Sequence, residues 1–268
     1  ALGEYQAYKT EDAGESRELE LRVARALKDL GAAIGTQRVA QTPLNEITRA
    51  DANALRDYLL ERMKPSSVHR YITVVRAAVN YVVTEHSLNI PNVFNGLRIK
   101  GASASIDDRL PISDQDLAMA RPNFDDDAVA NALFITLTDT GARLSEITGL
   151  EVGDINLQQR SITIRPNGVR ALKTKGSQRI LPLSQSALEV LQEHRRGKGD
   201  TQPMFPDYAR PRGRDAASAM LMKRLRRSIA DKKLTMHSLR HRMKDKLRNT
   251  GCPEAISLAI LGHSTNTV

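Results

Sequence analysis

Apolar residues recur at intervals of three and four through residues 1–97, which predicts a run of amphipathic helices. One helix is expected over about 15–30, with Gly31 as its stop, and another opens at a capping box formed by Thr48 and Asp51. Pro65 begins the clearest helix, whose apolar stripe consists of Val68, Tyr71, Ile72, Val75, Val79, Val82 and Val83. We therefore expect an all-helical domain over residues 1–100.

The helical pattern is lost between Arg98 and Pro111, where Gly, Ala, Ser and charged residues follow one another without a period. Such a composition is typical of a linker. We place an interdomain linker at 101–111 and a second domain at 112–268.

The second domain combines helices with short strands. Ser113 is a candidate N-cap, and residues 127–141 are predicted to form a buried helix that ends at Gly141. The segments 160–166 and 170–183 predict a small antiparallel sheet, and helical spacing returns at 184–195, 214–230, 236–249 and 253–261. The predicted class is α+β: an all-helical N-terminal domain, then a mainly helical domain with a small antiparallel sheet.

The charge of the chain favours a polyanionic partner, since the net charge is +9 and the pI is near 9.8. Residues 220–250 contain eleven Lys or Arg against two Asp, and this clustering makes double-stranded DNA the leading candidate. An aromatic content of 4% does not favour stacking on single strands. No long apolar run and no signal peptide is present, so no membrane partner is expected. The single cysteine, Cys252, fits a reducing cytoplasm.

Six basic residues are candidates for phosphate contacts. Two lie off the apolar stripe of the helix that begins at Pro65, two follow in the linker region, and two belong to the basic cluster. A solvated surface would explain the same charges equally well. The candidates are Arg70, Arg76, Arg98, Lys100, Arg242 and Lys244.

Four segments of the second domain carry residues suited to phosphate chemistry: TGARLSEITGL (140–150), KTKGSQRILPL (173–183), HSLRH (237–241) and LGHS (261–264). Breaking a phosphodiester without a metal requires cations for the charge that grows on the non-bridging oxygens. Arg143 and Arg240 could clamp one phosphate from two sides, because a guanidinium donates two parallel hydrogen bonds and stays protonated. A lysine on the hairpin, Lys173 or alternatively Lys175, could protonate the leaving 5′ oxygen.

The order and spacing of these segments resemble the tyrosine recombinase (phage integrase) family. The stretches TGARLSEITGLEVGDINL and HSLRHRMKDKLRNTG…LAILGHS are similar to its two signature boxes. The resemblance is strong over about 110–268. It is weaker over 1–97, where it rests on the helical pattern and on NIPNVFNGLRI.

This resemblance implies roles for further residues. His237 would assist proton transfer or orient the nucleophile, and His263 would donate a hydrogen bond to the phosphate. Glu146 would hold Arg143, although an acid one turn along a helix could also be a plain surface residue. His241 has no direct part in this interpretation.

A zinc site is the main alternative for the histidines. His237 and His241 are spaced i, i+4, and His263 could be a third ligand. The glutamate of an H-E-x-x-H motif is replaced by Ser238, no Cys or acid joins the group, and the surrounding basic residues would repel a dication. We therefore expect no metal at this site.

The family attacks with a tyrosine that becomes a covalent 3′-phosphotyrosine, so the resemblance also implies that no metal, nucleotide or other cofactor is needed. None of the six tyrosines follows Arg240. We therefore expect the nucleophile just beyond Val268, and the given sequence without it should not cleave DNA. The lack of an initiator Met before Ala1 likewise predicts a fragment of a longer protein.

The resemblance implies site-specific DNA recombination or integration, as in a phage or other mobile genetic element. It further implies a homo-tetramer on DNA, with a DNA-bending accessory protein as a candidate partner, in the cytoplasm of a bacterial or phage-infected cell. Two alternatives stay open: a catalytically inactive, sequence-specific DNA-binding protein of the same fold, and a type IB topoisomerase-like enzyme. A protein that only compacts DNA would not need the paired arginines.

Overall fold

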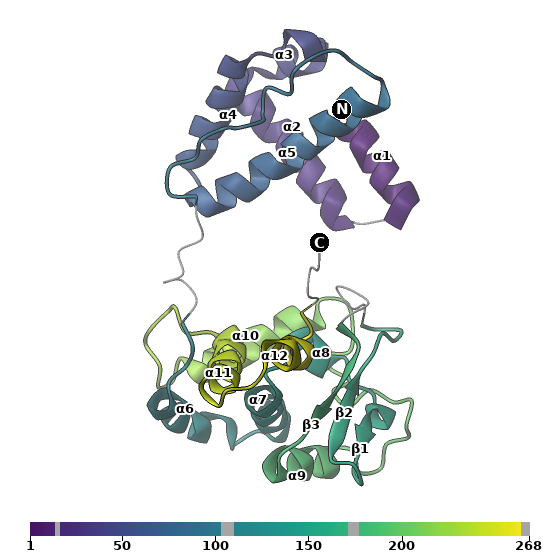
Figure 1. Ribbon diagram of the computed structural model, residues 1–268, viewed down its shortest axis with the longest axis vertical. Coiled ribbons are helices and arrows are strands. Elements are labelled where there is room, and N and C mark those ends of the chain that lie inside the picture. Colours follow the sequence, from purple (N-terminus) through teal and green to yellow (C-terminus); the bar gives the residue numbers. More distant parts are fainter. Residues whose placement is uncertain (14–16, 103–109, 171–176, 264–268) are drawn as a thin grey trace. The chain divides into compact units, whose positions relative to one another are not determined.

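The computed structural model describes residues 1–13, 17–102, 110–170 and 177–263 (Figure 1). Two compact units divide the chain, Ala1–Ala104 and Ser105–Val268. Each unit has its own hydrophobic core. None of the described helices is long and apolar enough to cross a membrane.

The described part of the first unit is helical, as the periodicity predicts. Its elements are α1 (Leu2–Ala13), α2 (Arg17–Ile34), α3 (Thr36–Gln41), the 3-10 turn η1 (Leu44–Glu46), α4 (Arg49–Leu60) and α5 (Pro65–Glu85). The capping box at the start of α4 is confirmed, because the Thr48 backbone N donates to Asp51 Oδ2 at 2.8 Å and the Asp51 backbone N donates to Thr48 Oγ1 at 3.3 Å. Asp51 also accepts two hydrogen bonds from Arg38, which ties α3 to α4.

Two features of this unit differ from the sequence prediction. The sequence pattern predicts helices from residue 1 onward but sets no bounds for α1, whose polar and apolar residues follow no clear stripe. The predicted stop at Gly31 is wrong, because α2 continues to Ile34. The turn occurs instead at Gly35, whose φ of 96° lies in the region that glycine tolerates best.

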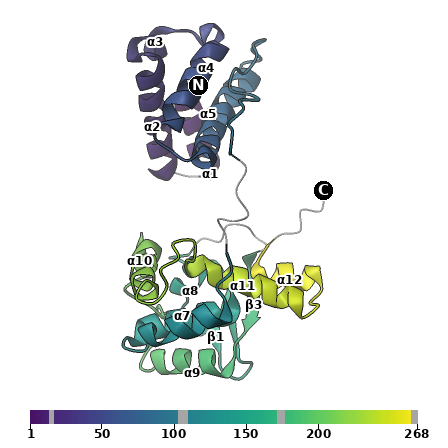
Figure 2. The ribbon, with the colours of Figure 1, turned by 90° about the vertical axis from the view of Figure 1, so that its left-hand side faces the viewer.

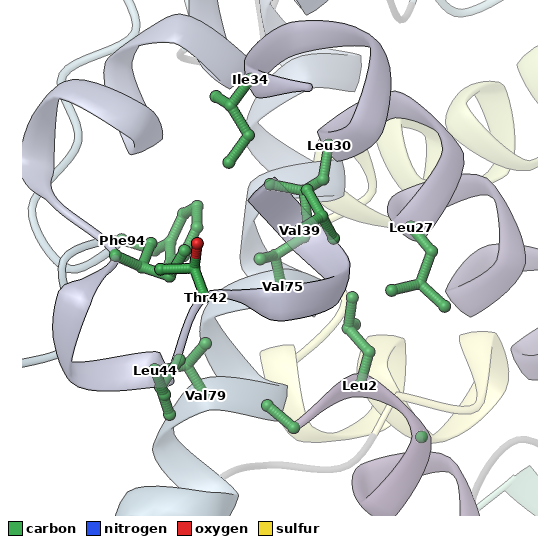
Figure 3. Close-up of a pocket in the computed structure, with 13 residues that line it drawn as sticks. Leu2, Leu27, Leu30, Ile34, Val39, Thr42, Leu44, Val75, Val79 and Phe94 are labelled. Atoms are coloured by element: carbon green, nitrogen blue, oxygen red, sulfur yellow. The ribbon is translucent and has the colours of Figure 1, made fainter. Parts of the chain in front are cut away.

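The first unit has a mainly apolar, half-open pocket of about 270 Å³ beside its core (Figure 3). Leu2 of α1, Leu30 of α2 and Val75 of α5 contribute to its wall, together with Phe94 from the segment that follows α5. Among the described residues, no charged side chain lines it. The basic residues of this unit therefore lie on other surfaces.

The second unit places helices around a three-stranded sheet. Its elements are α6 (Asp114–Ala120), η3 (Arg121–Phe124), α7 (Ala128–Thr140), α8 (Leu144–Thr148), η4 (Val152–Asp154), β1 (Ile155–Asn156), β2 (Ser161–Ile164), β3 (Arg179–Pro182), α9 (Gln185–His194), α10 (Gly213–Leu225), α11 (Met236–Asn249) and α12 (Glu254–Leu261). The strands are antiparallel in the order β1-β2-β3, and Ser161 pairs with Pro182 while Ile164 pairs with Arg179. The predicted α+β class and its small antiparallel sheet are confirmed.

Differences in this unit are small. The two-residue strand β1 was not predicted, because so short a segment carries no readable period. Helix α10 ends at Leu225 rather than near residue 230. Ser113 caps α6 as predicted, since its Oγ accepts from the Asp116 backbone N at 3.0 Å.

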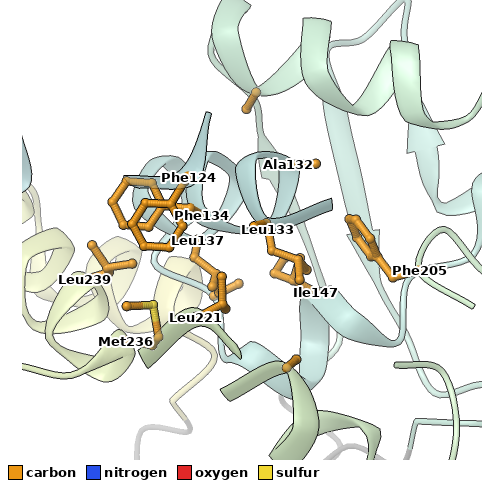
Figure 4. Close-up of a cluster of buried hydrophobic side chains, with 14 of the residues drawn as sticks. Phe124, Ala132, Leu133, Phe134, Leu137, Ile147, Phe205, Leu221, Met236 and Leu239 are labelled. Atoms are coloured by element: carbon orange, nitrogen blue, oxygen red, sulfur yellow. The ribbon is translucent and has the colours of Figure 1, made fainter. Parts of the chain in front are cut away.

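Helix α7 forms the centre of this unit and runs between α9 and α11 (Figure 2). It is apolar on most sides, and Leu133, Phe134 and Leu137 are buried (Figure 4). The Phe134 ring stacks on Phe124 with 3.9 Å between the centroids. Such burial fixes the two ends of α7, and the segment after its C-terminus carries Arg143.

Gly141 ends α7 with a φ of 61°. A Cβ at this position would lie 2.6 Å from the Met243 Cβ on α11. Only glycine therefore allows α7 and α11 to approach here while the chain turns sharply into α8. This close approach brings Arg143, just after Gly141, near Arg240 on α11.

Candidate active site

Arg143 and Arg240 lie close together although they come from distant segments of the chain. Arg240 is 5% exposed, and its Nη1 donates to the Gly141 carbonyl oxygen at 2.9 Å, two residues before Arg143. Burial, and next the nearby charge of Arg143, lower the pKa of Arg240 to about 10. Arg240 therefore stays cationic at neutral pH, but its charge is repelled by a second cation.

Both arginines reach the C-terminal end of α12, and a third arginine joins them there. Arg240 Nη2 donates to the Leu261 carbonyl oxygen, Arg143 Nη2 donates to that of Gly262 at 3.3 Å, and Arg179 Nε donates to that of Ile260 at 2.8 Å. The last carbonyls of a helix have no intrahelical partner and carry the negative end of its dipole. Three consecutive carbonyls therefore gather three guanidinium groups.

Glu146 links two of these arginines. Its Oε1 accepts from Arg143 Nη1 at 2.8 Å and its Oε2 from Arg179 Nη2 at 2.7 Å, while Oε2 also accepts from the Arg143 backbone N. The side chain is only 4% exposed, so Glu146 is not a surface acid. Burial raises the pKa of Glu146, but the hydrogen bonds and charges of Arg179 and Arg143 outweigh it and lower that pKa overall.

His263 follows Gly262 and contacts Arg240, with 3.1 Å between its Nε2 and Arg240 Nη2. Burial, and then the charges of Arg240 and Arg143, lower the pKa of His263. The imidazole is therefore neutral at pH 7. When Nε2 accepts from Arg240, the proton is on Nδ1, a tautomer assigned here from the hydrogen-bond partner.

His237 is exposed in the first turn of α11, one turn before Arg240. Its ring lies edge-on to that of His241, with 4.8 Å between the centroids. His237 and Arg143 line the same hollow of about 470 Å³, which Arg214 and Ser218 of α10 also line. Within the described residues, no group of three His, Cys, Asp or Glu side chains could hold a metal ion.

The two candidate general acids, Lys173 and Lys175, lie outside the described residues. The chain re-enters the described part at Ser177, next to Arg179. Arg179 is the site residue that the sequence analysis missed. A signal was present, since Arg179 and the buried Leu181 are two apart on one strand and so share a face, where a charged side chain needs a partner.

The six candidates for phosphate contacts differ in their surroundings. Arg70 lines a groove of about 740 Å³ in the first unit together with Arg22 and Arg25. Arg242 differs from the other candidates, because its side chain is 13% exposed and it is paired with Asp114. Of the remaining candidates, Arg76 is half-buried and three are exposed: Arg98, Lys100 and Lys244.

Comparison with known proteins places the chain in a family. Residues 115–268 match the sequence model of the phage integrase family, and this is more than half of the chain. The chain belongs to the phage integrase family. The predicted resemblance to tyrosine recombinases is thereby confirmed.

Curated relatives are tyrosine recombinases. The chain is 31% identical over 143 residues to tyrosine recombinase XerD of Corynebacterium glutamicum, a match that covers 51% of this chain and 45% of that protein. It is 24% identical over 235 residues to XerD of Shewanella oneidensis, covering 82% of this chain and 75% of that protein. The chain spans about half the length of the first curated relatives it matches.

Solved structures share the fold. The Tn1549 transposon integrase in complex with a circular intermediate DNA superposes with a TM-score of 0.74 at 18% identity, covering 98% of this chain and 91% of that one. A lambda integrase dimer bound to a COC′ core site gives a TM-score of 0.74 at 15% identity, covering 99% and 94%. At these identities the likeness supports the fold.

Proposed function

We propose that this chain provides the DNA-binding and phosphate-binding parts of a site-specific DNA recombinase that cleaves and rejoins strands without a metal. The observation that carries the proposal is the meeting of Arg143 and Arg240 at the end of α12, next to a neutral His263. Family membership supports the same conclusion. Double-stranded DNA is the proposed substrate, in keeping with the DNA complexes of the structurally similar integrases.

The proposed reaction exchanges one phosphoester for another. A tyrosine hydroxyl, expected beyond Val268, attacks the phosphorus, so that a bond from its oxygen to phosphorus forms while the bond to the 5′ oxygen breaks. The tyrosine loses its proton, with His237 assisting or orienting it, and the leaving 5′ oxygen gains one from Lys173 or Lys175. Rejoining reverses these steps, with a 5′ hydroxyl as the nucleophile.

The arginines would stabilise the charge that develops on the phosphate. Arg143 is the more accessible of the two, at 25% exposure, and it lines the hollow where a phosphate could enter. Arg240 would contribute from its buried position. The contact between Arg240 and His263 would have to loosen for these two side chains to face the same phosphate. The neutral His263 can donate through a ring nitrogen.

The first unit is also proposed to bind the duplex. The groove lined by Arg22, Arg25 and Arg70 supports this role, because guanidinium groups there can neutralise backbone phosphates. Exposed Lys244 would do the same in the second unit. A homo-tetramer on DNA is proposed as the active assembly, since a lambda integrase with this fold forms a tetramer on a Holliday junction.

Covalent trapping on nicked substrates tests the proposal. A binding site would first be selected from random duplexes with the full-length protein, and a nick near the scissile bond would then prevent rejoining. Arg143→Ala and Arg240→Ala should each lower the cleavage rate by about a hundredfold or more while largely preserving binding. Arg165→Ala is the matched control, because Arg165 is paired with Asp154 and Glu151 and does not line the hollow.

The outcomes separate the alternatives. Wild-type cleavage at one site, lost in both variants, supports the recombinase. Sequence-specific binding by full-length protein without any covalent adduct would instead indicate an inactive DNA-binding protein. Relaxation of supercoils without site preference would indicate a topoisomerase-like enzyme.

A further inference from the structure

Arg179 makes an unusually complete set of contacts for a residue to which the sequence analysis gave no role. It begins β3 and its side chain is 7% exposed. Its Nε donates to the Ile260 carbonyl oxygen at 2.8 Å, and its Nη1 donates to that of Ser177 at 2.8 Å. The remaining contacts go to Glu146, at 3.2 Å to Oε1 and 2.7 Å to Oε2.

We infer that Arg179 is a positioning residue that sets the geometry of the phosphate-binding arginines through Glu146 and the end of α12. The inference rests on the function proposed above. It concerns how Arg143 and Arg240 are held, which neither the family match nor the fold likeness addresses.

The contacts favour positioning over direct contact with DNA. A guanidinium has five N–H groups, and four of those of Arg179 already donate to protein acceptors. Its low exposure leaves no path for a phosphate to replace them. Arg143, by contrast, is 25% exposed and lines the hollow next to His237.

Arg179 acts on Arg143 through one carboxylate. Glu146 is buried, and a buried carboxylate stays ionised only when cations and donors compensate for lost water. Arg179 provides a two-point partner on one side, so that Glu146 can hold both the backbone N and the Nη1 of Arg143 on the other. Removing Arg179 would leave Arg143 as the principal cation for Glu146 and loosen this arrangement.

Arg179 acts on Arg240 through the end of α12. Of the residues in α12, Leu261 alone is fully buried within the described chain, and Ile260 packs partly against the core. The three arginine-to-carbonyl bonds at Ile260, Leu261 and Gly262 add polar attachment at its C-terminal end. Losing the bond to Ile260 would shift the adjacent carbonyl that Arg240 holds.

Gly262 provides independent geometric support. Its φ is 60°, and a Cβ built there would lie 2.6 Å from Arg179 Nη1 and 2.9 Å from its Cζ. The guanidinium thus lies flat against a backbone that has no room for a side chain. The close fit indicates that the position of Arg179 is tied to the Gly-His turn that carries His263.

Cleavage by the full-length protein as a function of pH tests the inference. Arg179→Gln should slow single-turnover cleavage at pH 7 by roughly tenfold or more. It should also move the acid limb of the pH–rate profile to higher pH, because Glu146 then protonates at higher pH and releases Arg143. Adding Glu146→Gln to Arg179→Gln should abolish this upward shift, since no titrating group is left.

Arg170→Gln is the matched control. Arg170 is also buried, at 3% exposure, and donates to the backbone carbonyl of Glu146, but not to its carboxylate. It should lower stability without moving the acid limb. If Arg179→Gln gives the same profile as Arg170→Gln, or the same as wild type, Arg179 has only a structural role and the inference is wrong.

Two further measurements keep the result independent of folding and of the proposed function. Should Arg179→Gln not fold, Arg179→Lys keeps the positive charge but cannot reproduce the two-point contact with Glu146 together with the bond to Ile260. Wild-type cleavage by that variant would overturn the inference. Titration of the Glu146 carboxyl by ¹³C NMR, assigned with Glu146→Gln, needs no activity. If the pKa of Glu146 rises in the Arg179 variant but the wild-type protein does not cleave DNA, the proposed function is wrong and the Arg179–Glu146 coupling still holds. If the pKa of Glu146 is unchanged in the Arg179 variant, the coupling itself is wrong.

Discussion

Replacing Gly262 by alanine should damage the site far more than the same change at Gly251. Both glycines have positive φ, 60° and 70°, so alanine is strained at either position by about 1 kcal/mol. They differ in their surroundings, because a Cβ at Gly251 meets nothing within 4 Å, whereas one at Gly262 meets the Arg179 guanidinium at 2.6 Å. The pair of variants therefore separates backbone strain from displacement of Arg179.

The magnitude follows from the bonds that Arg179 would lose. Relieving a 2.6 Å contact requires the guanidinium to move by close to 1 Å, which breaks at least one hydrogen bond to a charged group. Such a bond contributes about 1.5–3 kcal/mol. We expect Gly251→Ala to lower the free energy of unfolding by about 1 kcal/mol and Gly262→Ala by about 2.5–4 kcal/mol.

Calorimetry of the intact chain can measure this difference, and the transition of the second unit is the one to follow. For a unit of this size, about 1 kcal/mol corresponds to roughly 2–4 °C in Tm, so Gly251→Ala should lose a few degrees and Gly262→Ala roughly 5–16 °C. Cleavage measured well below both transitions should be near wild type for Gly251→Ala and strongly reduced for Gly262→Ala. Equal losses of stability and equal cleavage rates in the two variants would refute the claim that Arg179 and Gly262 depend on each other.

Three other changes have definite expected outcomes. Glu146→Gln should lower the free energy of unfolding at pH 7 by about 3 kcal/mol, because Arg143 and Arg179 lose the buried anion that they share. Since the folded-state pKa of Glu146 is lowered, the difference from wild type should shrink as the pH falls below about 4, and urea titrations at pH 7 and pH 3.5 would show whether it does. The hydrogen bond from Arg38 lowers the pKa of Asp51 from 3.8 to about 2, so Asp51→Asn should cost the first unit about 2 kcal/mol at pH 7 and remove the loss of stability that wild type shows between pH 4 and pH 2. Arg70→Ala should reduce the slope of log K against log salt for duplex binding by about 0.9, and an unchanged slope would exclude a phosphate contact at Arg70.

Local features were readable from the sequence where neighbouring residues determine them. The stripe of α5, the capping box of Thr48 and Asp51, and the glycine at the end of α7 each depend on a few adjacent positions, and each is found as predicted. Gly31 shows the limit of this reasoning. A glycine only lowers helix propensity, and the packing of α2 on α3 and α4 keeps the helix intact beyond it.

The candidate site was readable only in part. Motif spacing selected Arg143, Glu146, Arg240 and His263, and the structure brings these four together. Motif spacing could not identify Arg179 as a site residue, because the partners of Arg179 lie on α8 and α12, far from it in the chain. Nor does spacing show that Arg242, next to the site in sequence, is paired with Asp114.

The charge of the arginine cluster has a consequence for the proposed reaction. Three guanidinium groups and one carboxylate, with His263 neutral, give these residues a net charge of +2 (three positive minus one negative). Burial is the main cause of the lowered pKa of Arg240, and the charges of Arg143 and Arg179 add to it. A phosphodiester carries one negative charge, whereas the five-coordinate arrangement formed during attack carries a second. The net positive charge of the cluster is therefore better balanced by the transition state than by the bound substrate. Only an interaction that is stronger in the transition state accelerates a reaction. Glu146 reduces the net positive charge of the cluster without cancelling it. The carboxylate that holds the arginines in place therefore also sets how much positive charge is available to the phosphate.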